Sequence, residues 1–223
     1  MDYQFQFNVI WQNWDLFLKG VWLTIRITSI ATVLGLAIGM MMAGLQRTKH
    51  PAVTGPIRVY IEIIRNTPFL VQLFFVFFGL PSLGVKLQAN QAALIALTVN
   101  IGAYATEIVR AGIEAISEGQ IEAGRSLGLS GLQIFRFIIL KPALMTVYPA
   151  LTSQFILIML NSSVISVISA QELTYQANYL QSRTFRSFEI YFFVAFLYLA
   201  MSYLFRIVFG SISSVVFGKA PVN

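Results

Sequence analysis

Acidic and basic side chains recur three residues apart inside two strongly apolar stretches of the chain. Glu62 and Arg65 lie in one stretch, and Glu107 and Arg110 lie in the other. Residues three apart share one helix face, so each pair can form an ion pair. Ionisable groups inside a membrane usually face one another or a cavity. We favour two structural ion pairs over direct contact with a polar solute.

Several kinds of catalytic chemistry lack the residues they need. The chain has no cysteine, and His50 is its only histidine, so a thiol nucleophile or a cysteine or histidine metal cluster is excluded. The sequence contains neither the phosphate-binding pattern G-x-x-x-x-G-K-[ST] nor H-E-x-x-H. An intramembrane enzyme would need a catalytic pair, and Glu107 with Arg110 is a weak candidate. We expect no catalytic residue, metal or cofactor in this chain, and any ATP and Mg²⁺ would bind to a partner.

Polar residues and a proline also interrupt the apolar stretches. Pro68 removes a backbone donor and is expected to kink its helix, which would either expose carbonyl groups to a substrate or simply bend the helix. Asn161, Ser162 and Ser163 are consecutive polar residues that we place in the middle of another stretch. They could join helices by hydrogen bonds or offer donors and acceptors to a polar solute.

The composition predicts that these residues lie in a membrane. Of the 223 residues, 57% are hydrophobic and 11% are charged, against about 25% charged residues in soluble domains. A bilayer core about 30 Å thick requires roughly 20 apolar residues in a helix. Five stretches meet this requirement, namely 21–45, 57–80, 91–116, 143–168 and 190–217. We therefore predict an all-α integral membrane protein with five transmembrane helices.

Basic residues predict the orientation of these helices. The loops after the first and third stretches are the most basic, and they contain Arg47, Lys49 and Arg58, and Arg125, Arg136 and Lys141, respectively. Because Lys and Arg concentrate in cytoplasmic loops, the N-terminus is predicted outside and the C-terminus in the cytoplasm. The net charge of +6 lies at the ends of apolar stretches, which argues against nucleic acid as a partner.

Residues 1–20 form a separate predicted segment before a transmembrane domain at 21–217. Aromatic and aliphatic residues recur there at helical spacing beside polar ones: Phe7, Ile10, Trp11, Trp14, Phe17 and Leu18. This pattern is typical of an amphipathic helix at the membrane interface, and a turn packed against the bundle is equally compatible. The segment lacks the basic region and cleavage site of a secretory signal.

Residues 117–141 form a more polar cytoplasmic loop, predicted as a helix at 117–127, a turn, and a second helix. Gly128 follows the first helix where left-handed backbone geometry favours glycine. The second part carries a large apolar surface made of Leu129, Leu132, Ile134, Phe135, Phe137 and Ile138. Such a surface either docks a partner or folds back onto the bundle, and the residues alone do not separate these alternatives.

The run Glu122-Ala123-Gly124, followed by Gly128 and by Ile138-x-Leu140, resembles the EAA loop of ABC importer membrane subunits. In that family the loop forms a coupling helix that inserts into the cytoplasmic ATPase. Gly124 stands where alanine is usual, and Lys141 stands where proline is usual. The resemblance implies an ATPase contact through Glu122, Ala123, Gly124, Gly128, Leu129 and Phe135.

One branch of that family, the MetI-like permeases for polar amino acids such as histidine, glutamine, arginine or glutamate, is similar over nearly all of the remaining chain. Its second-span signature matches Glu62, Arg65, Thr67 and Pro68, and its third matches Asn100, Tyr104, Glu107, Arg110, Gly119 and Gln120. The resemblance implies a substrate pathway through Thr67, Pro68, Asn100, Tyr104, Asn161, Ser162 and Ser163. For Asn161, Ser162 and Ser163 the resemblance slightly favours substrate contact over helix packing.

The resemblance also implies an assembly in the bacterial cytoplasmic (inner) membrane. Its other members would be a second permease subunit, two cytoplasmic ATPase subunits and an extracytoplasmic binding protein that delivers a polar amino acid. Leu160 replaces a lysine that relatives often carry, which favours a paralogous over an identical second permease. The alternative function is an ion-coupled secondary transporter, against which the apolar loop and the lack of a detectable inverted repeat argue.

Overall fold

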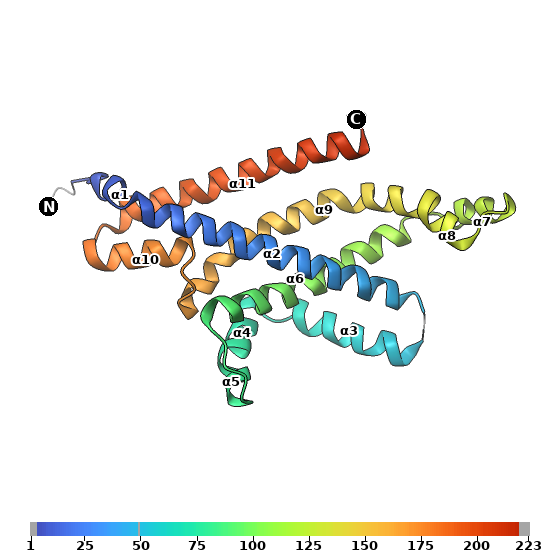
Figure 1. The fold of residues 1–223 in the computed structure, drawn as a ribbon, viewed down its shortest axis with the longest axis horizontal. Helices are drawn as coiled ribbons and strands as arrows, with labels where there is room; N and C mark the ends of the chain where they lie inside the picture. Colours follow the sequence, from blue (N-terminus) through green and yellow to red (C-terminus); the bar gives the residue numbers. More distant parts are fainter. Residues whose placement is uncertain (1–3, 49, 219–223) are drawn as a thin grey trace.

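The computed structural model describes residues 4–48 and 50–218. Within these ranges the chain forms helices and the turns between them. Four long helices pack along one another and make up most of the molecule (Figure 1), namely α2 (Trp14–Gln46), α6 (Ala89–Glu114), α9 (Leu140–Asn161) and α11 (Ser187–Phe217). Each belongs to an apolar helical stretch that is long enough to cross a membrane.

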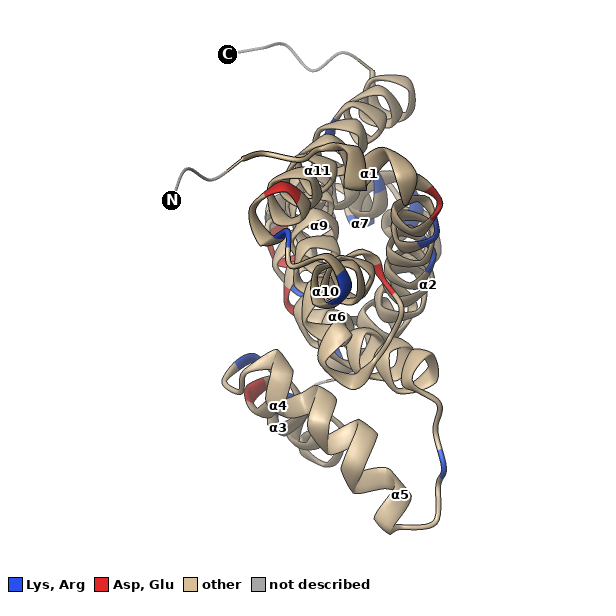
Figure 2. Ribbon diagram, turned by 90° about the vertical axis from the view of Figure 1, so that its left-hand side faces the viewer, with Lys and Arg blue, Asp and Glu red and all other residues tan. Residues whose placement is uncertain are grey.

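Shorter helices join or flank these four. They are α1 (Asn8–Gln12), α3 (Pro51–Arg65), α4 (Phe69–Phe74), α5 (Leu80–Ser82), α7 (Glu118–Ser126), α8 (Gly131–Gln133) and α10 (Leu173–Thr184). Phe75–Gly79 and Ile134–Ile139 are π-helical, and Ser162–Ile168 is a 3-10 helix. Figure 2 shows α3, α4 and α5 standing to one side of the bundle.

The prediction of an all-α membrane protein is confirmed, with a correction to the second of the five spans. We expected one kinked helix at 57–80. The structure instead has two helical segments, Pro51–Arg65 and Phe69–Ser82, bent by 111° at a short break, and these make a fifth span only if they are counted together. At the predicted boundary between residues 1–20 and the transmembrane domain, α2 already begins at Trp14, so residues 14–20 belong to the first long helix. The interfacial location of residues 1–20 stays a prediction.

Small residues allow α2 and α6 to approach closely. A Cβ atom on Gly35 would lie 2.6 Å from the Cβ of Ile101, and one on Gly39 would lie 2.9 Å from the carbonyl carbon of Ala105. The facing helix α6 buries a series of alanines, namely Ala92, Ala93, Ala96, Ala103 and Ala105. Tight packing through small residues is typical of helices in membranes, where burial of apolar surface gives little driving force. These contacts make α6 the central element of the bundle.

The turns of the bundle gather at two opposite ends (Figure 1). Helices α1 and α10 lie at one end, whereas the turn between α2 and α3 lies at the other end with α7 and α8. The two most basic loops of the sequence therefore share one end of the molecule. This arrangement agrees with the charge pattern, and the orientation of the bundle across a membrane stays a prediction.

Candidate functional site

The break between α3 and α4 is set by Pro68. Pro68 has an extended backbone (φ −62°, ψ 138°) and precedes the first residue of α4. It lacks a backbone donor, and its ring disfavours helical geometry at the preceding residue, so the hydrogen-bond ladder of α3 cannot continue through Thr67. The hydroxyl of Thr67 donates back to the Ile63 carbonyl oxygen at 2.8 Å. The predicted kink is thus a full interruption of the helix, and Thr67 and Pro68 are both exposed there.

Gln72 satisfies the carbonyl groups that this interruption leaves without helical partners. Its Nε2 donates to the carbonyl oxygens of Ile64 at 2.7 Å and Thr67 at 3.0 Å, and to the Thr67 hydroxyl at 3.0 Å. Its Oε1 accepts a hydrogen bond from Nδ2 of the buried Asn100 at 2.9 Å. We call Gln72 and Asn100 the clasp. Gln72 was not among the predicted site residues, although a polar residue four positions after a proline in an apolar run was a usable signal.

Ion pairs connect α3 with the second half of α6. Glu107 contacts Nη1 of Arg65 at 3.3 Å and Nη2 of Arg110 at 3.0 Å, and Arg110 also pairs with Glu114 at 2.7 Å. The Arg65 guanidinium lies 5.6 Å from the ring centre of Tyr104. Nearby, the Tyr60 hydroxyl donates to the Val99 carbonyl oxygen at 2.5 Å and fixes α3 against α6.

This network corrects one of the two predicted ion pairs. Glu107 and Arg110 do pair, but Arg65 reaches across to Glu107 instead of Glu62. Arg65 is the last residue of α3, where its side chain can extend toward α6. The carboxylate of Glu62 accepts a hydrogen bond from Nδ2 of Asn66 at 2.9 Å, and among the described residues no cation lies within 4.0 Å of it.

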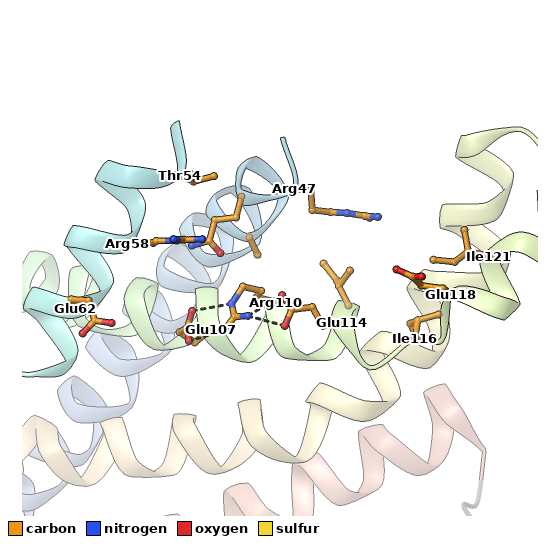
Figure 3. Close-up of a pocket in the computed structure, with 13 residues that line it drawn as sticks. Arg47, Thr54, Arg58, Glu62, Glu107, Arg110, Glu114, Ile116, Glu118 and Ile121 are labelled. Carbon is orange, nitrogen blue, oxygen red and sulfur yellow. Dashed lines mark hydrogen bonds and ion pairs between the residues drawn. The ribbon is translucent and has the colours of Figure 1, made fainter. Parts of the chain in front are cut away.

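Two adjacent cavities open beside these charges. The larger encloses about 770 Å³ between the end of α2, α3, the end of α6 and α7. Figure 3 shows charged side chains at this cavity from α3, α6 and α7, together with Arg47 directly after α2. Its polar lining consists of Gln46, Arg47, Thr54, Arg58, Glu62, Glu107, Arg110, Glu114 and Glu118. The smaller cavity encloses about 230 Å³ and is lined by Ile61, Glu62, Arg65, Asn66 and Tyr104. Glu62 lines both cavities.

Asn161, Ser162 and Ser163 lie within the fourth span, but near its end and not in its middle. We placed them in the middle of a helix, but α9 ends at Asn161 and a 3-10 helix begins at Ser162. The hydroxyls of Ser162 and Ser163 donate to the carbonyl oxygens three residues earlier, at 2.6 and 2.8 Å, and such bonds favour the tighter helix. Asn161 is exposed and Ser162 is buried. The 3-10 helix packs through Ile165 into the same buried cluster as Leu73 of α4.

A buried carboxyl group near α10 was not anticipated. Glu172 is fully buried and caps α10, where its oxygens accept hydrogen bonds from the backbone of Thr174 at 2.9 Å and Tyr175 at 2.7 Å and from the Tyr198 hydroxyl at 2.7 Å. Burial raises the pKa of this carboxyl to about 7, although these hydrogen bonds act in the opposite direction. The backbone N–H of Leu173 donates to the hydroxyl of Thr24 on α2. The cluster therefore ties α10 to α2 and α11.

The loop at 117–141 both folds back on itself and presents apolar side chains outward. Helix α7 covers nearly the predicted range, and Gly128 has the expected positive φ of 73°. Gly124 is buried, and a Cβ there would collide with the Ile138 side chain. Leu129 joins an inner cluster with Ile134 and Ile138, whereas other apolar side chains are exposed, namely Leu127, Leu132, Phe135 and Phe137. Glu122 and Ala123 are exposed as well.

The chain matches a known family over most of its length. The family described as "Binding-protein-dependent transport system inner membrane component" matches residues 35–216. The probable glutamine ABC transporter permease protein GlnM of Bacillus subtilis is 35% identical over 195 residues, covering 87% of this chain and 90% of that protein. The glutamine transport system permease protein GlnP of Escherichia coli is 35% identical over 202 residues, covering 89% and 92%.

Solved structures have the same fold. A crystal structure of an amino acid ABC transporter with histidines superposes with a TM-score of 0.89 at 34% identity, and it covers 96% of this chain and 100% of that chain. An inward-facing structure of the MetNI methionine ABC transporter superposes with a TM-score of 0.73 at 24% identity, covering 90% and 96%, which shows the shared fold alone.

Proposed function

The chain belongs to the family of binding-protein-dependent transport system inner membrane components, and from this we propose that it is the permease subunit of an ABC importer for polar amino acids. It is a multi-pass protein of the cytoplasmic (inner) membrane. The observation that carries this proposal is the position of α7 and α8, which project at one end of the bundle beside the charged cavity of about 770 Å³ (Figure 1, Figure 3). The surface that docks the ATPase in this proposal therefore lies next to the opening of a polar cavity.

The coupling segment, residues 117–141, docks a cytoplasmic ATPase in this proposal. Its outward apolar residues Leu127 and Leu132 are 79% and 77% exposed. Neither belongs to the inner cluster, so a partner can contact both without disturbing that cluster. ATP and Mg²⁺ bind to the ATPase, and this chain needs no cofactor of its own. ATP-driven closure of two ATPases moves two coupling segments together and shifts the population between outward- and inward-facing states.

A second permease subunit, identical or paralogous, completes the path. Helices α3 to α5 lie on one side of the bundle (Figure 2), and α4 with the π-helical turn after it exposes Leu70, Val71, Phe75 and Phe78. Helix α11 is also mostly exposed. These apolar surfaces face lipid or the second subunit. The opposite end, with α1 and α10, receives an extracytoplasmic binding protein.

The substrate class follows from the relatives and from the charges of the cavities. The curated relatives are permeases for glutamine, and the structural neighbour contains histidines. We propose a polar amino acid of this kind as the substrate of the present chain. Both cavities are lined by acidic and basic side chains, and a zwitterion requires both charges.

Co-purification with the ATPase tests the docking function. The chain and its candidate ATPase are co-expressed, extracted in detergent and captured through the ATPase. We expect Leu132→Asp to abolish retention, because it places a charge in an apolar contact without disturbing the fold. The matched control is Phe185→Asp, which changes an apolar residue of similar exposure (80%) at the opposite end of the bundle and should retain the ATPase. Equal retention of wild type and Leu132→Asp would contradict the proposed docking surface.

A further inference from the structure

Helix α10 is a short amphipathic helix that a small number of contacts hold against the bundle. It has 12 residues, and its buried residues are Leu173, Gln176, Ala177 and Leu180. The three apolar ones pack into one cluster with residues of α2 and α11. A helix of this length is only marginally stable in water by itself, so its position depends on these contacts and on its cap.

A single buried carboxyl group lies where α10, α11 and α2 meet. Glu172 is fully buried, and its oxygens cap α10 by accepting hydrogen bonds from two backbone N–H groups of the first turn. The hydroxyl of Tyr198 on α11 donates to the same carboxyl at 2.7 Å. Directly after Glu172, the N–H of Leu173 donates to the hydroxyl of Thr24 on α2 at 3.2 Å. A change at this carboxyl therefore acts on the attachment of α10 to both long helices.

The hydrogen bonds around Glu172 suit both the charged and the neutral carboxyl. The Tyr198 hydroxyl lies 2.7 Å from Oε2 of Glu172 and 3.0 Å from Oγ1 of Thr174, and either hydroxyl can be the donor in the second contact. With the carboxylate, Thr174 donates to Tyr198 and Tyr198 donates to Glu172. With the protonated carboxyl, both bonds reverse their direction. A proton can thus bind without leaving a buried polar group unpaired.

No cation compensates the charge of the buried carboxylate. In the described part of the chain, no Lys, Arg or His nitrogen lies within 4.0 Å of it, and Tyr198 is the titratable side chain that contacts it. The 3-10 helix beside α10 carries no charged residue. The charged residues of the three helices are exposed or contact other groups, namely Asp15, Lys19 and Arg26 on α2, Arg183 on α10, and Glu189 and Arg206 on α11. Burial therefore raises the pKa of Glu172 from 4.5 to about 7.

We propose that Glu172 is a proton-binding site that controls the docking of α10. The protonated carboxyl holds α10 against α2 and α11, and loss of the proton loosens α10, because water solvates the carboxylate better once the helix has detached. Docking is strongest below about pH 4.5 and weakens as the pH rises through about 7, since the docked form binds the proton more tightly.

This proton site gives the outer end of the bundle a sensitivity to acidity. In the proposed function, the end that contains α1 and α10 faces the extracytoplasmic solution, so the pH outside the cell sets how firmly α10 is held there. That consequence rests on the proposed function, whereas the docking of α10 by a protonated Glu172 does not. The two can therefore be tested separately.

Thiol labelling measures the docking, because the chain has no cysteine of its own. Ala177→Cys places one thiol on the buried face of α10, and Ser182→Cys places one on its exposed face. The full chain is purified in detergent and treated with a maleimide between pH 5 and pH 8. The labelling rate at position 177 is divided by that at position 182, which removes the pH dependence of the thiol itself. We expect the ratio to rise by about 10- to 100-fold over this range, as a pKa change of this size requires.

Glu172→Gln should abolish this rise, because an amide binds no proton in this pH range. The matched control is Glu189→Gln, which changes a second fully buried carboxyl and should keep the rise. Tyr198→Phe removes a donor that stabilises the carboxylate, so the ratio should level off at a higher pH. Size-exclusion profiles at each pH check that the variants are folded.

Two outcomes would overturn the proposal. One is a labelling ratio that does not change with pH when Glu172 is present, and the other is a rise of the same size in Glu172→Gln. Both leave the proposed function untouched, because the assay requires neither transport nor an ATPase.

Discussion

Nδ2 of Asn100 donates to Oε1 of Gln72 at 2.9 Å, and this bond joins the central helix α6 to the far side of a broken span. Through its Nε2 the same Gln72 side chain caps the carbonyl oxygens of Ile64 and Thr67 on the near side. The side-chain amide of Gln72 therefore holds the end of α3, α4 and α6 in fixed positions relative to one another. The 111° bend between the two halves of the span depends on this clasp as well as on Pro68.

Removal of the clasp should destabilise the protein. Gln72→Ala leaves the carbonyl oxygens and the amide of Asn100 without partners, which costs about 1–3 kcal/mol for a buried polar group. We expect a lower midpoint of thermal unfolding in detergent. The control is Gln120→Ala, which removes an exposed glutamine from α7 and should leave the midpoint unchanged. An unchanged midpoint for Gln72→Ala would show that water replaces the clasp.

Glu172 should make the stability depend on pH. Its pKa is raised from 4.5 to about 7, so the folded protein binds a proton more tightly than the unfolded chain does. The free energy of unfolding should fall as pH rises from about 4.5 to 7, by up to about 3 kcal/mol at about 1.4 kcal/mol per pKa unit. Thermal unfolding at pH 5 and pH 8 measures this difference. Glu172→Gln should remove it, whereas the exposed control Glu118→Gln should not.

The close approach of α2 and α6 should tolerate no added methyl group. Gly35→Ala would place a Cβ 2.6 Å from Ile101, so the helices must separate at a cost of about 1–3 kcal/mol. Gly44→Ala is the matched control on the same helix, because nothing lies within 4 Å of the added atom. That control should stabilise the protein by about 0.5–1 kcal/mol through the greater helix preference of alanine. Thermal unfolding of the two variants should therefore shift in opposite directions.

Gly124 and Ile138 should behave as a coupled pair. Gly124→Ala restores the alanine usual at this position in the EAA pattern, but its Cβ collides with Cδ1 of Ile138. We expect this variant to lose stability and to reduce the ATPase rate of the assembled transporter. Ile138→Val removes Cδ1, so the double variant should regain both. A double-mutant cycle measures the interaction, and additive effects would contradict direct contact between the two residues.

The sequence predicts the parts of the fold that depend on apolar length and local turn chemistry. Apolar runs identified the long helices, and Gly128 marked the end of α7, because these signals are local. The predicted partner of Arg65 was wrong, because i, i+3 spacing within α3 cannot reveal that Glu107 of α6 lies within reach. The role of Gln72 and the burial of Glu172 likewise depend on contacts between segments far apart in the sequence.

Helix α6 connects the clasp, the smaller cavity and the coupling segment within one continuous element. Asn100, Tyr104 and Glu107 lie on it, and it ends at Glu114, shortly before α7. At 1.5 Å per residue, Asn100 is about 21 Å from Glu114 along the helix axis. If a rigid helix of that length tilts by about 5° about its Glu114 end, Asn100 moves by about 2 Å. That displacement is several times the range of about 0.5 Å within which an N–H···O hydrogen bond holds, so a much smaller tilt caused by movement of α7 is enough to open the bond between Asn100 and Gln72.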